Sequence, residues 1–138
     1  MDFTKFAAKE TAFIHFKGPD GAYMYDDGKK VGVTVYGPSS KQYAIVDDRG
    51  SARALKRMQD NDNKISPIPG DERREQQAQD LAELTVSFEN ITYPPAGDAQ
   101  GSTLFAAFYA DPAMGFFKDQ VAAGVNKWGN FMPASAGN

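Results

Sequence analysis

The spacing of apolar residues changes at Gly37-Pro38, and this change constrains the fold more than any other feature of the sequence. Before this point apolar residues alternate with a period of two, so that Val31, Val33 and Val35 would share one face of a strand. After it they recur at intervals of three and four, which is typical of amphipathic helices. The sequence therefore predicts an α+β fold, with a small N-terminal antiparallel sheet of about three strands followed by about four helices.

The β-rich part is predicted within residues 11–36. Alternation over 12–16 predicts the first strand, and the turn residues Gly18-Pro19-Asp20-Gly21 would reverse the chain. Residues 22–25 would return as the second arm, and 31–36 would form the third strand.

Each predicted helix has its own start or stop signal. Ser39 or Ser40 can cap a first helix over 39–58, and Ser102 can cap the third. Asp111-Pro112 suits the start of the fourth helix, because proline at the first helical position loses no hydrogen bond. A loop is predicted over 59–70, and the second helix would run from 71 to Val86 or Phe88. The fourth helix would cover 111–129 and stop at Gly129.

Length and composition predict one domain over residues 1–138, in which 71–131 is mainly helical and 133–138 is a flexible tail. The net charge is -3, which gives no general attraction to nucleic acid or to anionic membranes. No apolar run is long enough to span a bilayer, and the N-terminal residues lack the features of a secretion signal. We therefore expect a cytoplasmic protein that binds neither nucleic acid nor membranes.

Residues that could perform catalysis or bind a metal are few. The chain has no cysteine and one histidine, His15, which lies in a predicted strand. A catalytic triad would need His15 with a serine and a carboxylate, and no serine lies in a Gly-x-Ser-x-Gly turn. We expect no enzymatic activity, no cofactor and no metal site.

A basic face is predicted on the first helix. Arg49, Arg53 and Arg57 recur at spacing four, with Lys56 beside them. Such a face is either solvated or binds an acidic partner. Tyr43, Val46, Gly50, Ala54 and Met58 would form the inner stripe of the same helix.

The C-terminal segment has the strongest apolar pattern in the chain. Its predicted protein-binding residues are Phe117, Val121, Val125, Trp128 and Phe131. Four of them, with Met114, recur at intervals of three and four, so that one continuous apolar stripe results. Either the chain's own core covers this stripe, or its end near Trp128 and Phe131 receives a partner, because large aromatic residues often anchor protein interfaces.

The order of short motifs resembles the tail assembly chaperone and minor tail protein family of long-tailed bacteriophages. The motifs are Asp20-Gly21, Tyr25-Asp26-Asp27-Gly28, Val33-Thr34-Val35-Tyr36-Gly37-Pro38-Ser39-Ser40, Arg53-Ala54-Leu55-Lys56-Arg57, Phe88-Glu89-Asn90-Ile91, Phe108-Tyr109-Ala110-Asp111-Pro112, Asp119-Gln120-Val121 and Gly129-Asn130-Phe131. Family members usually carry a tryptophan after the second helix, whereas this chain has Phe88 there and its only tryptophan at 128.

The resemblance implies a non-enzymatic protein that acts in virion morphogenesis. As a tail assembly chaperone it would bind the tape measure protein, the tail tube protein or both, in the host cytoplasm. The alternative is a structural minor tail protein that is retained in the virion tail. The resemblance leaves open whether the protein is a homo-oligomer.

Overall fold

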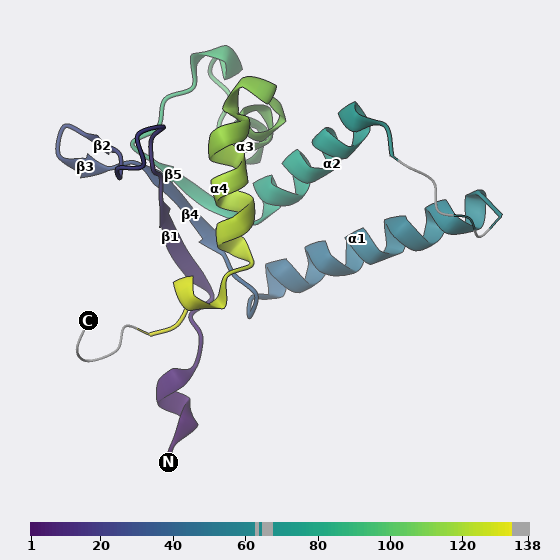
Figure 1. Ribbon diagram of the computed structural model, residues 1–138, viewed down its shortest axis with the longest axis horizontal. Helices are drawn as coiled ribbons and strands as arrows, with labels where there is room; N and C mark the ends of the chain where they lie inside the picture. The colour runs from purple at the N-terminus through teal and green to yellow at the C-terminus, as the bar shows by residue number, and fades with distance from the viewer. Residues whose placement is uncertain (63, 65–67, 134–138) are drawn as a thin grey trace.

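The computed structural model describes residues 1–62, 64 and 68–133, and it confirms the α+β class. Within these residues a three-stranded antiparallel sheet has the order β1-β4-β5, and the helices gather on one side of it (Figure 1). The strands are β1 Thr11–His15, β4 Gly32–Tyr36 and β5 Thr85–Glu89. A separate two-stranded hairpin contains β2 Tyr25–Asp26 and β3 Lys29–Lys30.

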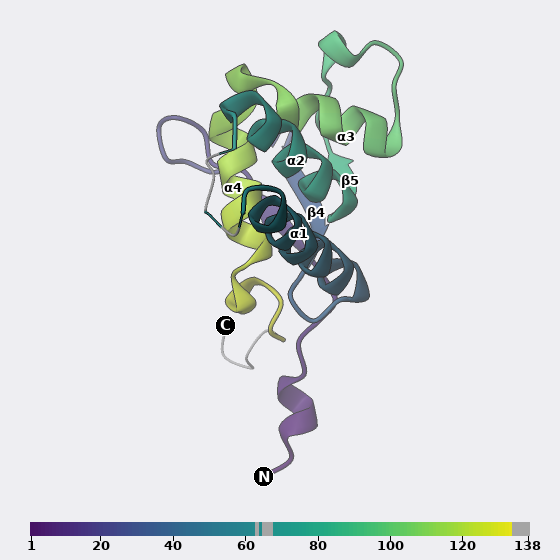
Figure 2. The ribbon, with the colours of Figure 1, turned by 90° about the vertical axis from the view of Figure 1, so that its right-hand side faces the viewer.

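The described helices differ in how closely they pack on the sheet. They are α1 Lys41–Asp60, α2 Gly70–Glu83, α3 Gly101–Ala110 and α4 Gly115–Val125. Short 3-10 turns are η1 Phe3–Phe6, η2 Pro94–Ala96, η3 Pro112–Met114 and η4 Trp128–Asn130. Figure 2 shows α1 end-on, extending away from the sheet toward the viewer. No helix in the described part of the chain is long and apolar enough to cross a membrane.

The third strand of the sheet comes from a segment that was predicted to be helical. The prediction that the second helix continues to Val86 or Phe88 is wrong, because α2 ends at Glu83 and the next residues form β5. Thr85 and Val86 are β-branched, which favours a strand. The amide of Tyr36 donates to the carbonyl of Leu84 over 2.7 Å, so the chain joins the sheet at once.

Residues 22–25 do not supply a strand of the main sheet as predicted. An isolated bridge joins Lys17 to Tyr23, and Tyr25 then begins the small hairpin. The turn at Asp27 and Gly28 has positive φ at both positions, as a tight hairpin requires. The chain therefore makes an extra loop between β1 and β4, which pair directly with each other.

Of the three predicted helix caps, two hold and one does not. The Ser40 hydroxyl accepts from the Tyr43 amide at 3.1 Å, which confirms its capping role. Asp111 also accepts from the Ala113 amide, although it caps η3 rather than α4. Ser102 is not a cap, because it lies inside α3, where Gln100 occupies the cap position.

Helix α4 ends at Val125 rather than at Gly129, so the prediction for its end is wrong. The side-chain amide of Asn130 donates to the carbonyl of Gly124 at 3.1 Å, and the Lys127 amide donates to the same carbonyl. These bonds satisfy a carbonyl at the helix end and turn the chain into η4. Of the predicted loop and tail, residues 63, 65–67 and 134–138 lie outside the described residues.

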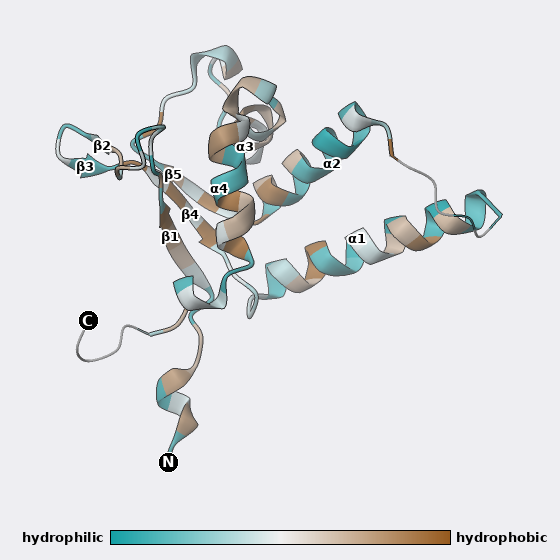
Figure 3. Ribbon diagram, in the orientation of Figure 1, coloured by the Kyte–Doolittle hydropathy of each residue, from teal (hydrophilic) through white to brown (hydrophobic). Residues whose placement is uncertain are grey.

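The core lies between the inner face of the sheet and helices α2, α3 and α4. Val33 and Val35 are completely buried at its centre, and Figure 3 shows hydrophobic residues concentrated on β1 and β4. The ring of Phe88 packs against Phe105 and Phe108 at centroid distances of 4.6 and 5.2 Å. This aromatic cluster fastens β5 to α3.

A chain of two buried hydrogen bonds links Tyr109, Thr85 and Leu81 in the core. The Thr85 hydroxyl lies 2.7 Å from both the Leu81 carbonyl and the Tyr109 hydroxyl. Because a carbonyl can only accept, Thr85 donates to Leu81 and Tyr109 donates to Thr85. Burial raises the pKa of Tyr109 well above its ordinary value, which keeps this donor protonated.

Two glycines allow the C-terminal segment to approach the sheet closely. A Cβ atom at Gly37 would lie 2.4 Å from the ring of Phe131, and one at Gly124 would lie 2.7 Å from Cδ1 of Ile14. Both distances are too short for a real contact. The packing of Phe131 therefore requires glycine at 37, whereas a Cβ atom at 124 would force the end of the Ile14 side chain to move.

Candidate protein-binding surface

Most of the residues predicted to bind a partner belong to the protein's own core. Val121, Val125 and Phe131 are buried, with Phe131 completely enclosed. Phe117 is partly buried and packs against Phe16 at a ring-centroid distance of 5.1 Å. These side chains stabilise the fold, so in this structure they are not exposed as a docking surface.

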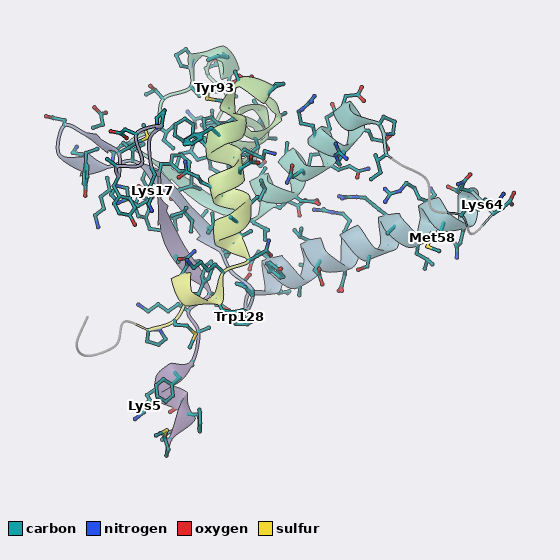
Figure 4. The ribbon with its side chains drawn as sticks, in the orientation of Figure 1. Lys5, Lys17, Met58, Lys64, Tyr93 and Trp128 are labelled. Carbon is teal, nitrogen blue, oxygen red and sulfur yellow. The ribbon has the colours of Figure 1, made fainter. Side chains whose placement is uncertain are left out.

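Trp128 is the exception among the five predicted residues. Its side chain is 54% exposed, and it lies in η4, beyond the end of α4 (Figure 4). Of the five predicted residues, four are therefore buried or partly buried, and Trp128 is exposed.

Helix α1 has an unusual environment for a helix of its length. It contains 20 residues, and none of them is buried. Helices in proteins obtain most of their stability from packing an apolar face, and isolated helices in water are marginal. Exposed apolar side chains on α1 include Ile45, Leu55 and Met58. We call α1 the arm of the molecule.

The arm is held by contacts at its base and along one side. At the base the Tyr43 hydroxyl donates to Oδ1 of Asn126 on the turn after α4. Along the side Arg49 makes a two-pronged contact with Glu83, at 2.7 and 2.9 Å. Asp80 accepts from both Arg49 and Arg53. Arg49 and Arg53 of the basic face therefore bind carboxylates of α2 in the same chain.

These ion pairs lie near the surface. The Asp80 side chain is 22% exposed and that of Arg49 is 35% exposed, so solvent screens their attraction. The bond to Glu83, followed by that to Asp80, raises the pKa of Arg49, which therefore stays charged. Such pairs fix orientation more than they add stability.

A groove of about 740 Å³ separates α1 from α2, and we call it the arm groove. Its lining residues are Tyr43, Val46, Asp47, Gly50, Ser51, Ala54, Arg73, Gln77, Asp80, Leu81, Leu84, Ala122, Val125 and Asn126. Leu81, Leu84 and Val125 are buried core residues, so the groove reaches down to the hydrophobic core. Its walls carry polar residues from both helices.

The predicted inner stripe of the first helix faces this groove. Tyr43, Val46, Gly50 and Ala54 all line it, whereas Met58 does not. Sequence reasoning missed the opposite wall, made by Arg73, Gln77 and Asp80 on α2. The signal that could have found it is the match between basic residues on one helix and acidic residues on the other.

Among the described residues no group of three His, Cys, Asp or Glu side chains is placed to hold a metal ion. His15 lies away from the arm groove, and its Nε2 contacts the Met24 carbonyl at 2.8 Å. Because a carbonyl only accepts, Nε2 carries the proton in this contact.

Comparisons of the chain with protein family models, curated proteins and solved structures found no match.

Proposed function

We propose that the protein is a bacteriophage tail assembly chaperone that binds apolar helical segments of the tape measure protein, the tail tube protein or both. The arm groove is the proposed binding site. The observation that carries this proposal is the arm itself, a 20-residue helix with no buried residue beside a groove whose floor is apolar. The motif order described above supports the choice of partners.

The groove has the chemistry of a helix-binding site. Amphipathic helices bind other proteins by placing their apolar face in a hydrophobic groove. Here Leu81, Leu84 and Val125 provide the apolar floor, and the two flanking helices provide polar rims. A helix of 20 residues is about 30 Å long, so the arm offers several turns of contact.

Binding of this kind would suit a chaperone. A tape measure protein is a long helical rod, and exposed apolar surface on such a rod favours aggregation. A partner helix in the groove would cover that surface and would also bury apolar atoms of α1. Because the ion pairs that hold the arm are partly exposed, the arm could adjust to its partner at low energetic cost.

Co-expression with the tape measure and tail tube proteins, followed by affinity purification, tests the proposal. We expect at least one of them to co-purify. Ala54→Glu places a charge in the groove and should abolish capture. Ala52→Glu is the matched control, because Ala52 is exposed on the same helix and does not line the groove. Equal capture by the two variants, or failure of the unmodified protein to capture either partner, would contradict the proposal.

If the protein is instead a structural minor tail protein, it should remain in the virion tail. Quantitative mass spectrometry of purified virions distinguishes the two roles. A chaperone should be scarce in the particle, whereas a minor tail protein should be present in stoichiometric amount. Stoichiometric recovery would assign the protein to the virion tail.

A further inference from the structure

The outer edge of β1 carries backbone groups that point away from the sheet. In an antiparallel pair, residues alternate between hydrogen-bonding to the neighbouring strand and pointing away from it. The Gly37 amide donates to Glu10, and the Phe16 amide donates to Val31, so the even-numbered residues of this segment bond toward β4. The odd-numbered residues of β1 therefore direct their amides and carbonyls outward. They are Thr11, Phe13 and His15.

The two ends of this edge are already paired within the chain. At one end the Lys17 amide donates to Oε1 of Gln120 and the Lys17 carbonyl accepts from Nε2, each at 2.9 Å. The Gln120 side chain thus makes the pair of bonds that a neighbouring strand would make. At the other end the Lys9 amide donates to the Phe131 carbonyl at 2.7 Å. Between these ends, no hydrogen bond within the described residues reaches the backbone amides or carbonyls of these three residues.

A groove of about 390 Å³ lies along this unpaired stretch, between β1 and α4, and we call it the edge groove. Its lining residues are Phe13, Ile14, His15, Lys17, Tyr23, Gln120, Ala123, Gly124, Lys127 and Asn130. On the helix wall Ala123 is exposed, whereas Gly124 packs closely against the Ile14 side chain. The groove combines a free strand edge, a helix wall and the aromatic rings of Phe13 and Tyr23.

The charged residues that line the edge groove are all positive. Lys17 and Lys127 line it and no carboxylate does, and both lysines are exposed (Figure 4 labels Lys17 near the end of β1). The ammonium of Lys17 lies 5.1 Å from the ring centroid of Tyr23. Neither lysine makes an ion pair within the described part of the chain. The groove therefore favours an occupant with a negative side chain.

We propose that the edge groove binds an extended segment of another protein, which adds a strand to β1 and places an Asp or Glu side chain near Lys17 and Lys127. Strand addition of this kind takes its affinity from backbone hydrogen bonds and its specificity from alternate side chains. The site is separate from the arm groove, so it provides a second mode of binding.

A second copy of the chain fits this edge less well. If two β1 strands paired antiparallel about Phe13, Lys9 of each would lie opposite Lys17 of the other. Like charges directly opposite each other destabilise a strand pair. The strand itself, Thr11–His15, contains no carboxylate to meet the lysines. The acidic partner segment is therefore the occupant that the charges favour.

Selection from a displayed library of random peptides, each about ten residues long, tests the proposal on the full chain. We expect enriched peptides with β-branched residues and at least one Asp or Glu. In amide hydrogen exchange, an enriched peptide should protect Thr11, Phe13 and His15. The amides of Ala12 and Ile14, which already bond to β4, should change little. Absence of enriched peptides, or protection confined to other residues, would overturn the proposal.

Charge reversal separates this site from nonspecific attraction. The double variant Lys17→Glu, Lys127→Glu should weaken peptide binding by about tenfold, the expected effect of two exposed ion pairs. Lys29→Glu with Lys56→Glu has the same net charge outside the groove and should bind as the parent does. Equal weakening in both double variants would contradict the site. Protection of the outward amides that grows with protein concentration, without peptide, would instead identify a second copy as the occupant and overturn the proposal.

Discussion

The sheet with α2, α3 and α4 and the arm formed by α1 are stabilised in different ways. In the first region, apolar side chains such as Val33, Val121 and Phe131 are completely buried. In the second, none of 20 residues is buried, and ion pairs hold the helix in place. One chain thus contains a closely packed core and a helix that reaches it only through Tyr43 and Val46, while Ile45, Leu55 and Met58 stay exposed. The predictions below test whether this division is real.

Truncation of a core residue should have the largest effect. Phe131→Ala should lower the free energy of unfolding by about 3–5 kcal/mol, because the ring is completely enclosed and packs over Gly37. Leu55→Ala on the arm, where the side chain is 58% exposed, should change it by less than about 0.5 kcal/mol. Urea denaturation measures both. Similar losses in the two variants would contradict the division.

Breaking the buried hydrogen bonds of Thr85 should have the next largest effect on stability. Thr85→Val removes the acceptor of the Tyr109 hydroxyl and should lower the free energy of unfolding by about 1–3 kcal/mol. Tyr109→Phe leaves the Thr85–Leu81 bond intact and should cost about 1 kcal/mol. Thermal or urea unfolding of both variants provides the measurement. If Tyr109→Phe were the more damaging change, the assigned donor direction would be wrong.

Loss of the ion pairs should loosen the arm alone. Asp80→Asn removes a carboxylate that binds both Arg49 and Arg53, at a cost of about 1 kcal/mol that shrinks with added salt. Hydrogen exchange should accelerate in α1 and stay unchanged in β4 and α3. Asp48→Asn, at an exposed position of the same helix, is the control and should leave exchange unaltered. Uniform acceleration across the molecule would show that the arm is part of one cooperative unit.

A surface hydrogen bond should give the smallest effect, seen only as a change with pH. The bond from Tyr93, followed by that from the Ala113 amide, lowers the pKa of Asp111 below 3.8. Its contribution to stability is therefore present above that pH and is lost as the pH falls through the folded-state pKa. The same bond raises the pKa of Tyr93 above 10.0, so the contribution is fully present below that pH and is lost as the pH rises through the higher folded-state pKa of Tyr93.

The variant Tyr93→Phe tests this pH dependence. The stability difference between it and the parent protein should be greatest between these two limits and should decrease on either side. Denaturation curves across the pH range supply the values. A difference that does not vary with pH would show that Tyr93 acts through packing alone.

The fold class was predictable from the sequence because the apolar period changes sharply at Gly37-Pro38. The third strand was not, because Leu84, Thr85 and Phe88 fit the helical period as well as they fit a strand. Pairing with β4 decides between them, and that pairing joins residues about fifty positions apart along the chain. The local spacing of apolar residues carries no information about such tertiary contacts.

The site was predictable only in part. The apolar stripe was apparent from the sequence, but whether the chain's own core or a partner covers it was left open, and the structure shows Val121 and Phe131 buried in the core. The basic face on α1 was also identified, although its carboxylate partners belong to α2. The edge groove depends on which backbone groups of β1 point outward, and this is fixed by register rather than by residue type.

Substitution of Gly50 tests most directly whether the arm groove is the binding site. Gly50 lines the groove, and a Cβ atom there would meet nothing within 4 Å, so alanine fits at this position and a leucine side chain would extend further into the groove. Gly50→Ala and Gly50→Leu should both stabilise α1, by about 0.5–1 kcal/mol, because glycine is a poor helix former. Affinity purification with the co-expressed tail proteins should show capture by Gly50→Ala and loss of capture by Gly50→Leu. Equal capture by the two folded variants would contradict the claim that the arm groove is the binding site.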